Sequence, residues 1–363
     1  MGKKLDSILE KVKSTYKVAV TDANEIGVIE RAPLDSCGLN YAFGGGMPLG
    51  RMLFIHGPAS GGKSVLSCYL AMQVQKKMNK AVLYLDYEYT FSAEYASQMG
   101  LDLSPEKFIL IRPSNGEDGF NLIRDLVETG EVGFVVIDSI SAMSSKSACD
   151  DAFSGFAGGK NAIMISNGLR MIMPYLYNNK CTMIVLSQER ASMSMYGADY
   201  KATGGNSPNF YSSWTARVTR TEDILDTDKS LIGICMKVRN TKNKVGIAKR
   251  EANLKLYFNS GINSEDEYID YLKSLHLLEQ KGAYYSNAEW VADDGTVGMK
   301  VCGLEAVKNW LLENPKMYEK VKQQVNDIII GHTNLDAENN DDDNGITTLE
   351  DGTKINADGE IVE

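Results

Sequence analysis

The chain has 363 residues, 43% of them hydrophobic and 24% charged, which is ordinary for a protein that folds in water. Its apolar runs are short, as at 134–137, and its N-terminus mixes acids with lysines, so neither a membrane span nor a secretory signal is predicted. Six cysteines without a CxxC pair and only three histidines argue against a disulfide framework or a zinc site. The net charge of −10 is concentrated at one end, because residues 336–363 carry ten acids and one lysine.

Residues 1–17 are predicted to form a short amphipathic helix with a lysine-rich polar face. A helix of this length is marginal alone, so its apolar face must pack against something. Its own core and a neighbouring subunit are equally good candidates. The apolar residues that recur at helical spacing are Leu5, Ile8, Leu9, Val12 and Tyr16.

Residues 51–188 alternate short apolar runs with stretches of helical periodicity. Continuous apolar strands separated by helices indicate an α/β fold with a mostly parallel sheet covered on both faces. Right-handed crossovers bring the C-terminal ends of such strands to one edge, where ligands bind. The predicted strands are 51–56, 81–86, 108–111, 134–138 and 182–187. The predicted helices are 64–78, 92–99, 117–129 and 161–178, with Gly100 and Gly130 as C-terminal caps.

A phosphate-binding loop is predicted at the end of the first of these strands. Its glycines let backbone N–H groups face a phosphate at the N-terminus of the following helix. We expect Lys63 to reach the β- and γ-phosphates of ATP and the Ser64 hydroxyl to hold Mg²⁺. The motif G-x-x-x-x-G-K-[ST] is filled by Gly57, Pro58, Ala59, Ser60, Gly61, Gly62, Lys63 and Ser64.

Four polar residues stand at or just beyond the ends of other strands, and therefore at the same edge. Asp138 ends its strand and is expected to orient the magnesium shell. Glu88 lies two residues beyond Asp86, and either carboxylate could polarise a water for attack on the γ-phosphate. Gln188 directly follows its strand, where a γ-phosphate contact and a solvated strand end are comparable readings.

Two long segments interrupt the alternation of strands and helices, and both leave from the ligand edge. Residues 141–160 and 189–209 are rich in Gly and Ser, lack periodicity and are predicted to be functional loops. Their acids and bases cancel, so a contact with DNA would depend on stacking side chains and backbone N–H groups. The side chains that could stack are Met193, Met195, Tyr196, Phe153 and Phe156.

After residue 210 the chain is predicted to be rich in β-strands. Residues 237–255 carry seven basic residues against Glu251. Lys242 and Lys244 lie in a predicted turn of this segment. A solvated hairpin face and a contact to phosphate or nucleic acid both fit these charges.

The C-terminal part of the chain is predicted to contain a small α+β unit followed by an acidic tail. Helices are expected at 266–274, 304–313 and 315–329. From residue 333 onward the chain has few large apolar residues and many acids, and we expect it to be disordered.

Together these motifs resemble the RecA family of recombinases, which form ATP-driven filaments on DNA. The resemblance covers residues 1–331 and depends on the order of GPASGGKS, LDYEYTFSAEYASQMG, FVVIDS, IVLSQER, TGGNSPNFYSS and VRNTKNKVG. It implies a RecA-type P-loop ATPase core with two DNA-binding loops, 141–160 and 189–209. The implied parts are an N-terminal helix and oligomerisation arm (1–33), the core (34–265), a small C-terminal domain (266–332) and the tail (333–363).

The resemblance also implies roles for individual residues. It favours Glu88 over Asp86 as the catalytic glutamate. Lys242 and Lys244 match lysines that reach the ATP of the neighbouring subunit, and the segment 18–20 matches an edge strand given to the next core. Other implied nucleotide contacts are Asp138 as the Walker B acid, Tyr95 on the adenine and Gln188 as γ-phosphate sensor. The implied DNA contacts are Lys160, Arg170, Arg190, Met193, Met195, Tyr196, Gly204 and Gly205.

The sequence departs from the family pattern at several positions. Ser92 stands where the family often has an aspartate that contacts adenine. Ile163 replaces a basic DNA contact, for which Lys160 could compensate. Glu189 adds an acid beside the sensor Gln188. These departures indicate a divergent member, such as one encoded by a phage.

The sequence therefore predicts a DNA recombinase that uses ATP and Mg²⁺. It would polymerise as a helical filament on single-stranded DNA, pair it with homologous duplex and release DNA on hydrolysis. Single-strand-binding and loading proteins are candidate partners, and a cytoplasmic location is expected, in the host if the source is a phage. Two alternatives stay open: a RecA-fold motor such as a ring helicase or translocase, and a non-catalytic recombination mediator.

Overall fold

The computed structural model describes residues 3–16, 29–150, 157–194, 197–202 and 205–340, together with the short pairs 347–348 and 354–355. The chain divides into two compact units, residues 1–30 and the rest. In the first unit, α1 (Lys3–Tyr16) forms the predicted N-terminal helix. The predicted edge strand at 18–20 lies outside the described residues.

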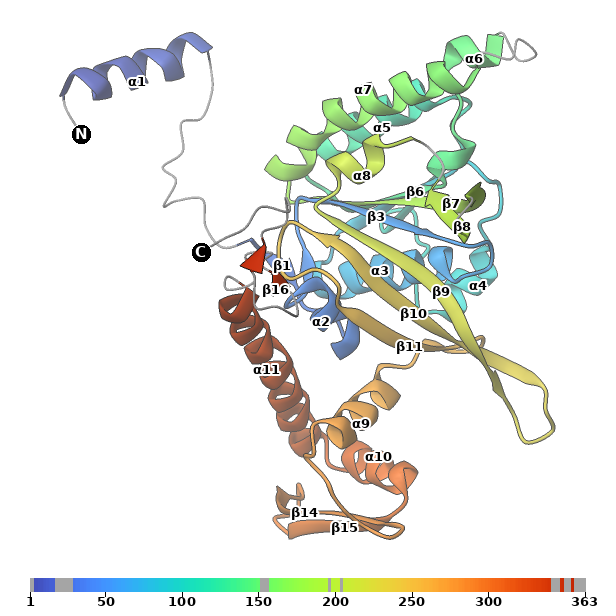
Figure 1. Cartoon of the computed structure of the whole chain (residues 1–363), viewed down its shortest axis with the longest axis vertical. Helices are drawn as coiled ribbons and strands as arrows, with labels where there is room; N and C mark the ends of the chain where they lie inside the picture. The colour runs from blue at the N-terminus through green and yellow to red at the C-terminus, as the bar shows by residue number, and fades with distance from the viewer. Residues whose placement is uncertain are drawn as a thin grey trace. The chain divides into compact units, whose positions relative to one another are not determined.

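A ten-stranded sheet forms the centre of the second unit, in the order β12-β11-β10-β9-β3-β7-β6-β4-β5, with β8 paired to β7 (Figure 1). From β9 to β5 neighbouring strands are parallel, and from β9 to β12 they are antiparallel. The mostly parallel α/β core predicted from the sequence is therefore confirmed. Its strands are β3 (Met52–Gly57), β4 (Ala81–Asp86), β5 (Phe108–Ile111), β6 (Val132–Asp138), β7 (Thr182–Ser194), β8 (Gly197–Ala202), β9 (Trp214–Leu225), β10 (Leu231–Asn243), β11 (Glu251–Tyr257) and β12 (Gly261–Ile262).

Helices cover both faces of the parallel strands, as Figure 1 shows. On β3, Leu53 and Ile55 face the layer of α3, whereas Met52 and Phe54 face the layer of α5 and α7. This alternation follows from the two-residue period of a strand, and it buries every apolar residue of β3. The helices are α2 (Cys37–Phe43), α3 (Lys63–Met78) and α4 (Ala93–Gln98) on one face, and α5 (Gly116–Glu128) and α7 (Ala157–Asn178) on the other.

Both segments predicted to be loops contain regular structure. The first holds the short helices η1 (Ile140–Ala142) and α6 (Lys146–Asp150). In the second, β7 runs on to Ser194 and pairs with β8 as an antiparallel hairpin, and α8 (Ser207–Tyr211) follows. The expectation that these segments lack secondary structure is wrong for most of their length. Their polar composition concealed a hairpin that projects beyond the sheet.

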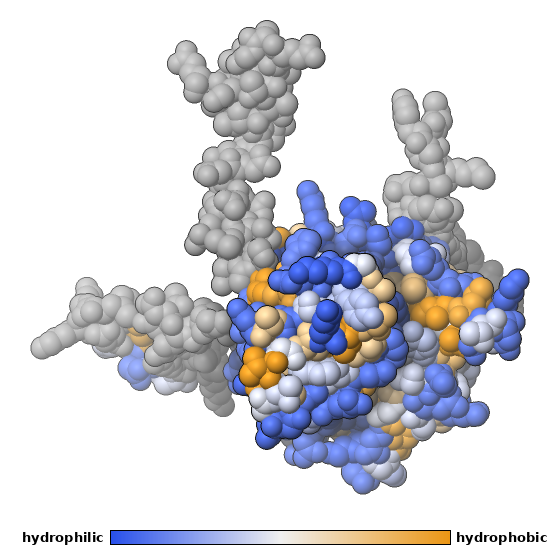
Figure 2. Space-filling view, turned by 90° about the horizontal axis from the view of Figure 1, so that it is seen from below, coloured by the Kyte–Doolittle hydropathy of each residue, from blue (hydrophilic) through white to orange (hydrophobic). Residues whose placement is uncertain are grey.

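The C-terminal elements pack around a further apolar core, which also includes Cys37 of α2. Trp290 and Trp310 stack there with ring centroids 5.8 Å apart, and Tyr268, Val321 and Val325 are buried beside them. Figure 2 shows the molecule from below, and the coloured part of this face is mostly hydrophilic with separate hydrophobic patches. The elements are α9 (Ser264–Ser274), β13 (Glu279–Lys281), β14 (Tyr284–Val291), β15 (Val297–Cys302), α10 (Leu304–Glu313) and α11 (Pro315–Asn340).

The helix α11 extends beyond residue 332, where the acidic tail was predicted to begin. The segment 333–340 is polar but contains neither Gly nor Pro, so nothing in it forces the helix to stop. The boundary between helix and tail therefore lies later than the composition indicated. Beyond it, only the short strands β16 (Thr347–Thr348) and β17 (Lys354–Ile355) are described.

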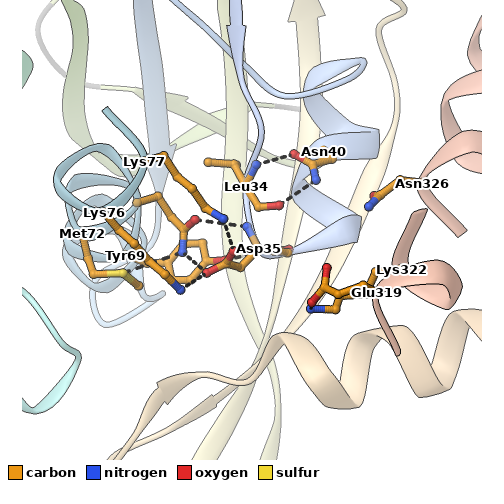
Figure 3. Close-up of polar contacts among 12 residues, drawn as sticks. Leu34, Asp35, Asn40, Tyr69, Met72, Lys76, Lys77, Glu319, Lys322 and Asn326 are labelled. Carbon is orange, nitrogen blue, oxygen red and sulfur yellow. Dashed lines mark hydrogen bonds and ion pairs between the residues drawn. The ribbon is translucent and has the colours of Figure 1, made fainter. Parts of the chain in front are cut away.

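Two acids, Asp35 and Glu267, connect the segment at the N-terminus of α2 to α3 and α9. Asp35 forms ion pairs with Lys76 and Lys77 at the end of α3, both at 2.8 Å, as Figure 3 shows. Glu267 of α9 is buried, and its Oε2 accepts hydrogen bonds from the Ser36 hydroxyl at 2.7 Å and from the Gly38 amide at 3.2 Å. The second contact joins the C-terminal unit to the N-terminus of α2.

Candidate nucleotide-binding site

The predicted phosphate-binding loop connects the C-terminal end of β3 to the first turn of α3. Ser60 and Gly62 have left-handed backbone conformations, with φ of 56° and 93°. A Cβ on Gly57 would lie 2.1 Å from the backbone oxygen of Val218, so only glycine fits there. The loop curls over the N-terminus of α3, where the helix dipole favours an anion.

The two functional side chains of the loop take separate directions. Lys63 Nζ donates hydrogen bonds to the carbonyl oxygens of Gly57 at 3.1 Å and Pro58 at 2.7 Å, which holds its charge inside the loop. Burial lowers the pKa of Lys63, although nearby carboxylates oppose this effect. Ser64 Oγ donates to Asp138 Oδ2 at 2.8 Å. The predicted partnership of Ser64 and Asp138 is thus formed in space.

The surroundings of Asp138 suit a magnesium ion. Its Oδ2 also accepts a hydrogen bond from the buried Tyr84 hydroxyl at 2.7 Å. Burial raises the pKa of Asp138, while the hydrogen bonds from Tyr84 and Ser64 lower it. The Asp138 carboxylate and the Ser64 hydroxyl, whose oxygens lie 2.8 Å from each other, are hard oxygen donors. Mg²⁺ prefers such donors beside nucleotide phosphates. Among the described residues, no cluster of three His, Cys, Asp or Glu side chains forms another metal site.

Glu88 and Gln188 meet at the same edge of the sheet. Gln188 Nε2 donates to Glu88 Oε1 at 3.1 Å and to Oε2 at 3.3 Å. The Ser139 hydroxyl donates to Glu88 Oε1. The backbone N–H of Gln188 donates to Ser141 Oγ at 3.2 Å. Gln188 is therefore not a solvated strand end, because it contacts the carboxylate proposed to activate water.

Asp86 has a structural task that removes it from the competition with Glu88. It is buried, and it accepts hydrogen bonds from Arg112 Nε at 3.1 Å and from the amides of Thr90 at 3.2 Å and Phe91 at 3.3 Å. These contacts fix the turn after β4. Glu88, two residues further on, instead contacts Ser139 and Gln188.

Tyr95, which the resemblance places on the adenine, lines a cavity beside the P-loop residue Ser64. This cavity of about 110 Å³ is lined by Ser64, Asp138 and Tyr95, among others. Ser92 acts as the N-cap of α4, its hydroxyl accepting from the Tyr95 amide at 3.3 Å. One cavity thus connects the proposed magnesium donors with an aromatic ring on which a base could stack.

Lys242 lies on β10 and Lys244 directly follows it, two strands away from β3, which leads into the P-loop. Lys242 pairs with Thr215 of β9, which is level with Phe54 of β3, three residues before the P-loop begins. Lys242 Nζ donates to carbonyl oxygens of α8, and Lys244 Nζ donates to the Phe210 carbonyl at 3.2 Å. These contacts place the pair on a different surface from Lys63.

The described part of the predicted DNA surface follows one face of α7. Lys160, Ile163 and Arg170 share this face, and Ile163 is 64% exposed. Arg170 Nη2 donates to Asn167 Oδ1 at 2.9 Å. Gly205 lies nearby, since a Cβ on it would be 3.9 Å from Cβ of Ala162. The end of the second loop therefore lies beside the start of α7.

Other predicted DNA contacts are described only in part. Arg190 and Met193 are residues of β7, and they pair with Lys201 and Ala198 of β8. Met195, Tyr196, Gly204, Phe153 and Phe156 lie outside the described residues.

A basic cleft on the open face of the antiparallel strands was only partly predicted. It is lined by Arg217 of β9 together with Lys237, Arg239 and Lys249. Glu251 pairs with Lys237 at 3.1 Å and Arg239 at 3.3 Å, and Glu189 pairs with Arg217 at 2.8 Å, so the two acids offset only part of this charge. The basic segment 237–255 thus contributes a concave positive surface rather than only a solvated face.

The sequence did not identify four partners of the site. Tyr84 and Ser139 hold Asp138 and Glu88, while His56 and Arg217 both contact Glu189. A signal was available for Ser139, which directly follows Asp138. The other three are set by which strands are neighbours, and composition carries no such information.

The fold and the site define a P-loop nucleotide-binding protein with a mostly parallel α/β sheet. The RecA N-terminal domain family matches residues 3–263, and the chain therefore belongs to the RecA family of recombinases. Protein RecA of Campylobacter lari is 29% identical over 333 residues, covering 90% of this chain and 93% of its own. That of Sulfurimonas denitrificans is 32% identical over 284 residues, covering 77% and 81%. That of Mycoplasma genitalium is 32% identical over 305 residues, covering 83% and 86%.

The family match favours a function in DNA recombination and repair, with binding of ATP and DNA, over a ring motor or a mediator. In the parts of the chain that the structure describes, no helix is both long and apolar enough to span a bilayer.

Proposed function

We propose that this protein is a DNA-dependent ATPase that polymerises on single-stranded DNA and exchanges it with homologous duplex. This proposal depends on two hydrogen-bonded pairs at one edge of the sheet, Ser64 with Asp138 and Glu88 with Gln188. These contacts supply a phosphate loop, magnesium donors, a carboxylate for water and a sensor in one place.

The proposed hydrolysis depends on positioning and charge rather than on a covalent intermediate. Glu88 accepts hydrogen bonds from Ser139 and Gln188, which fix the carboxylate beside the P-loop. From there it would orient a water toward the γ-phosphate and accept a proton from that water as the water attacks and the bond to ADP breaks. Mg²⁺, held through Ser64 and Asp138, would neutralise phosphate charge. Tyr95 stacks on the adenine.

The active assembly in this proposal is a filament in which two subunits share each ATP. Lys242 and Lys244 lie two strands away from β3 and donate hydrogen bonds to carbonyl oxygens of α8, which supports a role toward a neighbouring subunit. DNA would lie along α7 and the hairpin of β7 and β8, with the basic cleft around Arg239 as further phosphate-binding surface. Single-strand-binding and loading proteins, and a cytoplasmic site of action, belong to the same proposal.

The proposal is tested by measuring ATP hydrolysis with and without single-stranded DNA, followed by a strand-exchange assay. We expect hydrolysis to be strongly stimulated by the DNA and exchange to require ATP. Hydrolysis without any response to DNA would instead favour an ATPase of another class. Electron microscopy with ATP and DNA adds a check on assembly: helical filaments support the recombinase, and closed rings support a motor.

A further inference from the structure

Glu189 is a buried acid that the proposed catalytic steps do not use. Its side chain is only 1% exposed, and it contacts β3, which is the neighbouring strand, and β9, which lies beyond β3. His56 Nδ1 on β3 lies 2.8 Å from Glu189 Oε1. Arg217 on β9 makes a bidentate contact, with Nε 2.8 Å from Oε1 and Nη2 2.9 Å from Oε2. One carboxylate thus connects three consecutive strands of the sheet, β7, β3 and β9.

Glu189 lies next to the sensor but on the opposite face of the sheet. Gln188 continues the series of Leu186, which faces the α3 layer, and it contacts Glu88 there. Glu189 continues the series of Val185, which faces α5 and α7. It is also the first residue of β7 that pairs with β8, opposite Ala202. The peptide that carries the sensor therefore joins the nucleotide side of the sheet to the proposed DNA hairpin.

The charge states of Glu189, Arg217 and His56 favour the hydrogen bonds between them. Burial raises the pKa of Glu189, but the hydrogen bonds from Arg217 and His56 outweigh burial and hold that pKa below its usual value. Burial lowers the pKa of His56 and outweighs the effect of Glu189. Glu189 is then ionised and His56 neutral, so Nδ1 carries the proton and donates it to the carboxylate. Bidentate guanidinium contacts of this kind are strong and directional.

We propose that Glu189 is a positioning residue: through Arg217 and His56 it locks Gln188 and the β7–β8 hairpin to the P-loop strand, so that nucleotide and DNA are sensed by one rigid piece. His56 directly precedes the P-loop and Glu189 directly follows the sensor, so a shift at either end is transmitted to the other. This inference rests on the proposed DNA-dependent ATPase function.

The test compares Glu189→Gln with the wild type in ATP hydrolysis, with and without single-stranded DNA. The amide keeps the shape but loses the charge, and the NH2 group that replaces one carboxylate oxygen cannot accept the second hydrogen bond from Arg217. We expect the KM for ATP to stay within about twofold, while DNA-stimulated kcat falls about tenfold or more, because small misplacements of a catalytic group are costly. Glu189→Asp should lie between the two, since it restores the charge at a shorter reach.

The matched control is Asp266→Asn in the C-terminal unit. Asp266 is likewise a carboxylate with one cation and one further hydrogen-bond partner, Lys308 at 2.8 Å and the Tyr257 hydroxyl at 3.1 Å, although it is more exposed than Glu189. This variant should keep the wild-type response to DNA. If it loses that response to the same extent, the effect of Glu189→Gln is only a general loss of stability and the proposal is overturned.

A double variant, Glu189→Leu with Arg217→Met, guards against a folding defect from an unpaired buried charge. It should unfold near the wild-type temperature and still lack most of the DNA stimulation. The positioning role would be overturned if DNA stimulated hydrolysis normally in Glu189→Gln or in the double variant, or if the KM for ATP rose as much as kcat fell. Neither result would affect the proposed ATPase function. A wild type that hydrolyses no ATP with DNA would overturn the proposed function and this inference together.

Discussion

Asp86 and Glu88 are two residues apart, yet their surroundings assign them different tasks. Asp86 is enclosed by Arg112 and two backbone amides, whereas Glu88 contacts Gln188 and Ser139 at the P-loop edge. We predict that Glu88→Gln binds ATP normally but hydrolyses it about 100-fold more slowly, because only the group that polarises water is lost. Nucleotide-binding and steady-state hydrolysis assays measure the two properties separately.

Asp86→Asn is the natural comparison for this variant. It should lower the free energy of unfolding by about 1–3 kcal/mol, because it weakens hydrogen bonds to a buried acceptor, and should leave hydrolysis largely intact. Normal hydrolysis by Glu88→Gln would remove Glu88 from its catalytic role. Lys63→Ala should abolish turnover in the same assay, since it removes the charge held by the carbonyls of Gly57 and Pro58.

The residues that sequence alone could identify are those with a motif or a strand end to mark them. The P-loop, Asp138 and Gln188 are of this kind, and the structure brings them together. Glu189 could be recognised only as an acid in an unusual place. Its partners His56 and Arg217 lie 133 and 28 positions away in the chain, and only the strand order β9-β3-β7 makes them neighbours.

Strands and helices whose apolar residues recur with a clear period were predicted with nearly correct bounds. Elements made mostly of polar residues were not predicted. The helices expected at 64–78 and 117–129 begin within one residue of α3 and α5. The hairpin of β7 and β8 was missed because its strands project beyond the sheet and carry no alternating apolar pattern. Pairing there depends on backbone hydrogen bonds, which composition does not report.

The junction between α9 and α2 should respond to pH. Burial raises the pKa of Glu267 to about 7, partly offset by hydrogen bonds from Ser36 and Gly38. Between its ordinary pKa and this value the folded protein binds more protons than the unfolded chain, so stability falls as pH rises through that window. The full effect on the free energy of unfolding is about 3 kcal/mol.

Glu267→Gln should therefore flatten the dependence of the unfolding temperature on pH between about pH 5 and 8. The gain over the wild type should be largest at the alkaline end, where the wild-type carboxylate is charged and buried. Thermal unfolding followed by circular dichroism across this range measures the difference. Parallel curves for variant and wild type would show that Glu267 does not titrate in this window.

At the scale of the whole molecule, charge is distributed unevenly. Residues beyond α11, from 341 to 363, carry eight acids and one lysine, whereas a basic cleft is formed around Arg217 and Arg239. We predict that removal of 341–363 tightens binding to duplex DNA severalfold at low salt, with a smaller effect as screening increases. Salt titrations of DNA binding by the two proteins test this, and superimposable curves would exclude an electrostatic role for the tail.

The central claim is that each ATP is shared between two subunits, and mixing two inactive proteins tests it most directly. One carries Lys63→Ala, and the other carries Lys242→Ala with Lys244→Ala. Both should assemble with wild-type protein and hydrolyse little ATP alone. In mixed filaments some junctions place an intact P-loop against an intact lysine pair, so we predict that DNA-stimulated hydrolysis returns and is greatest near equal amounts. Two proteins that assemble together but stay inactive at every ratio would contradict the shared site.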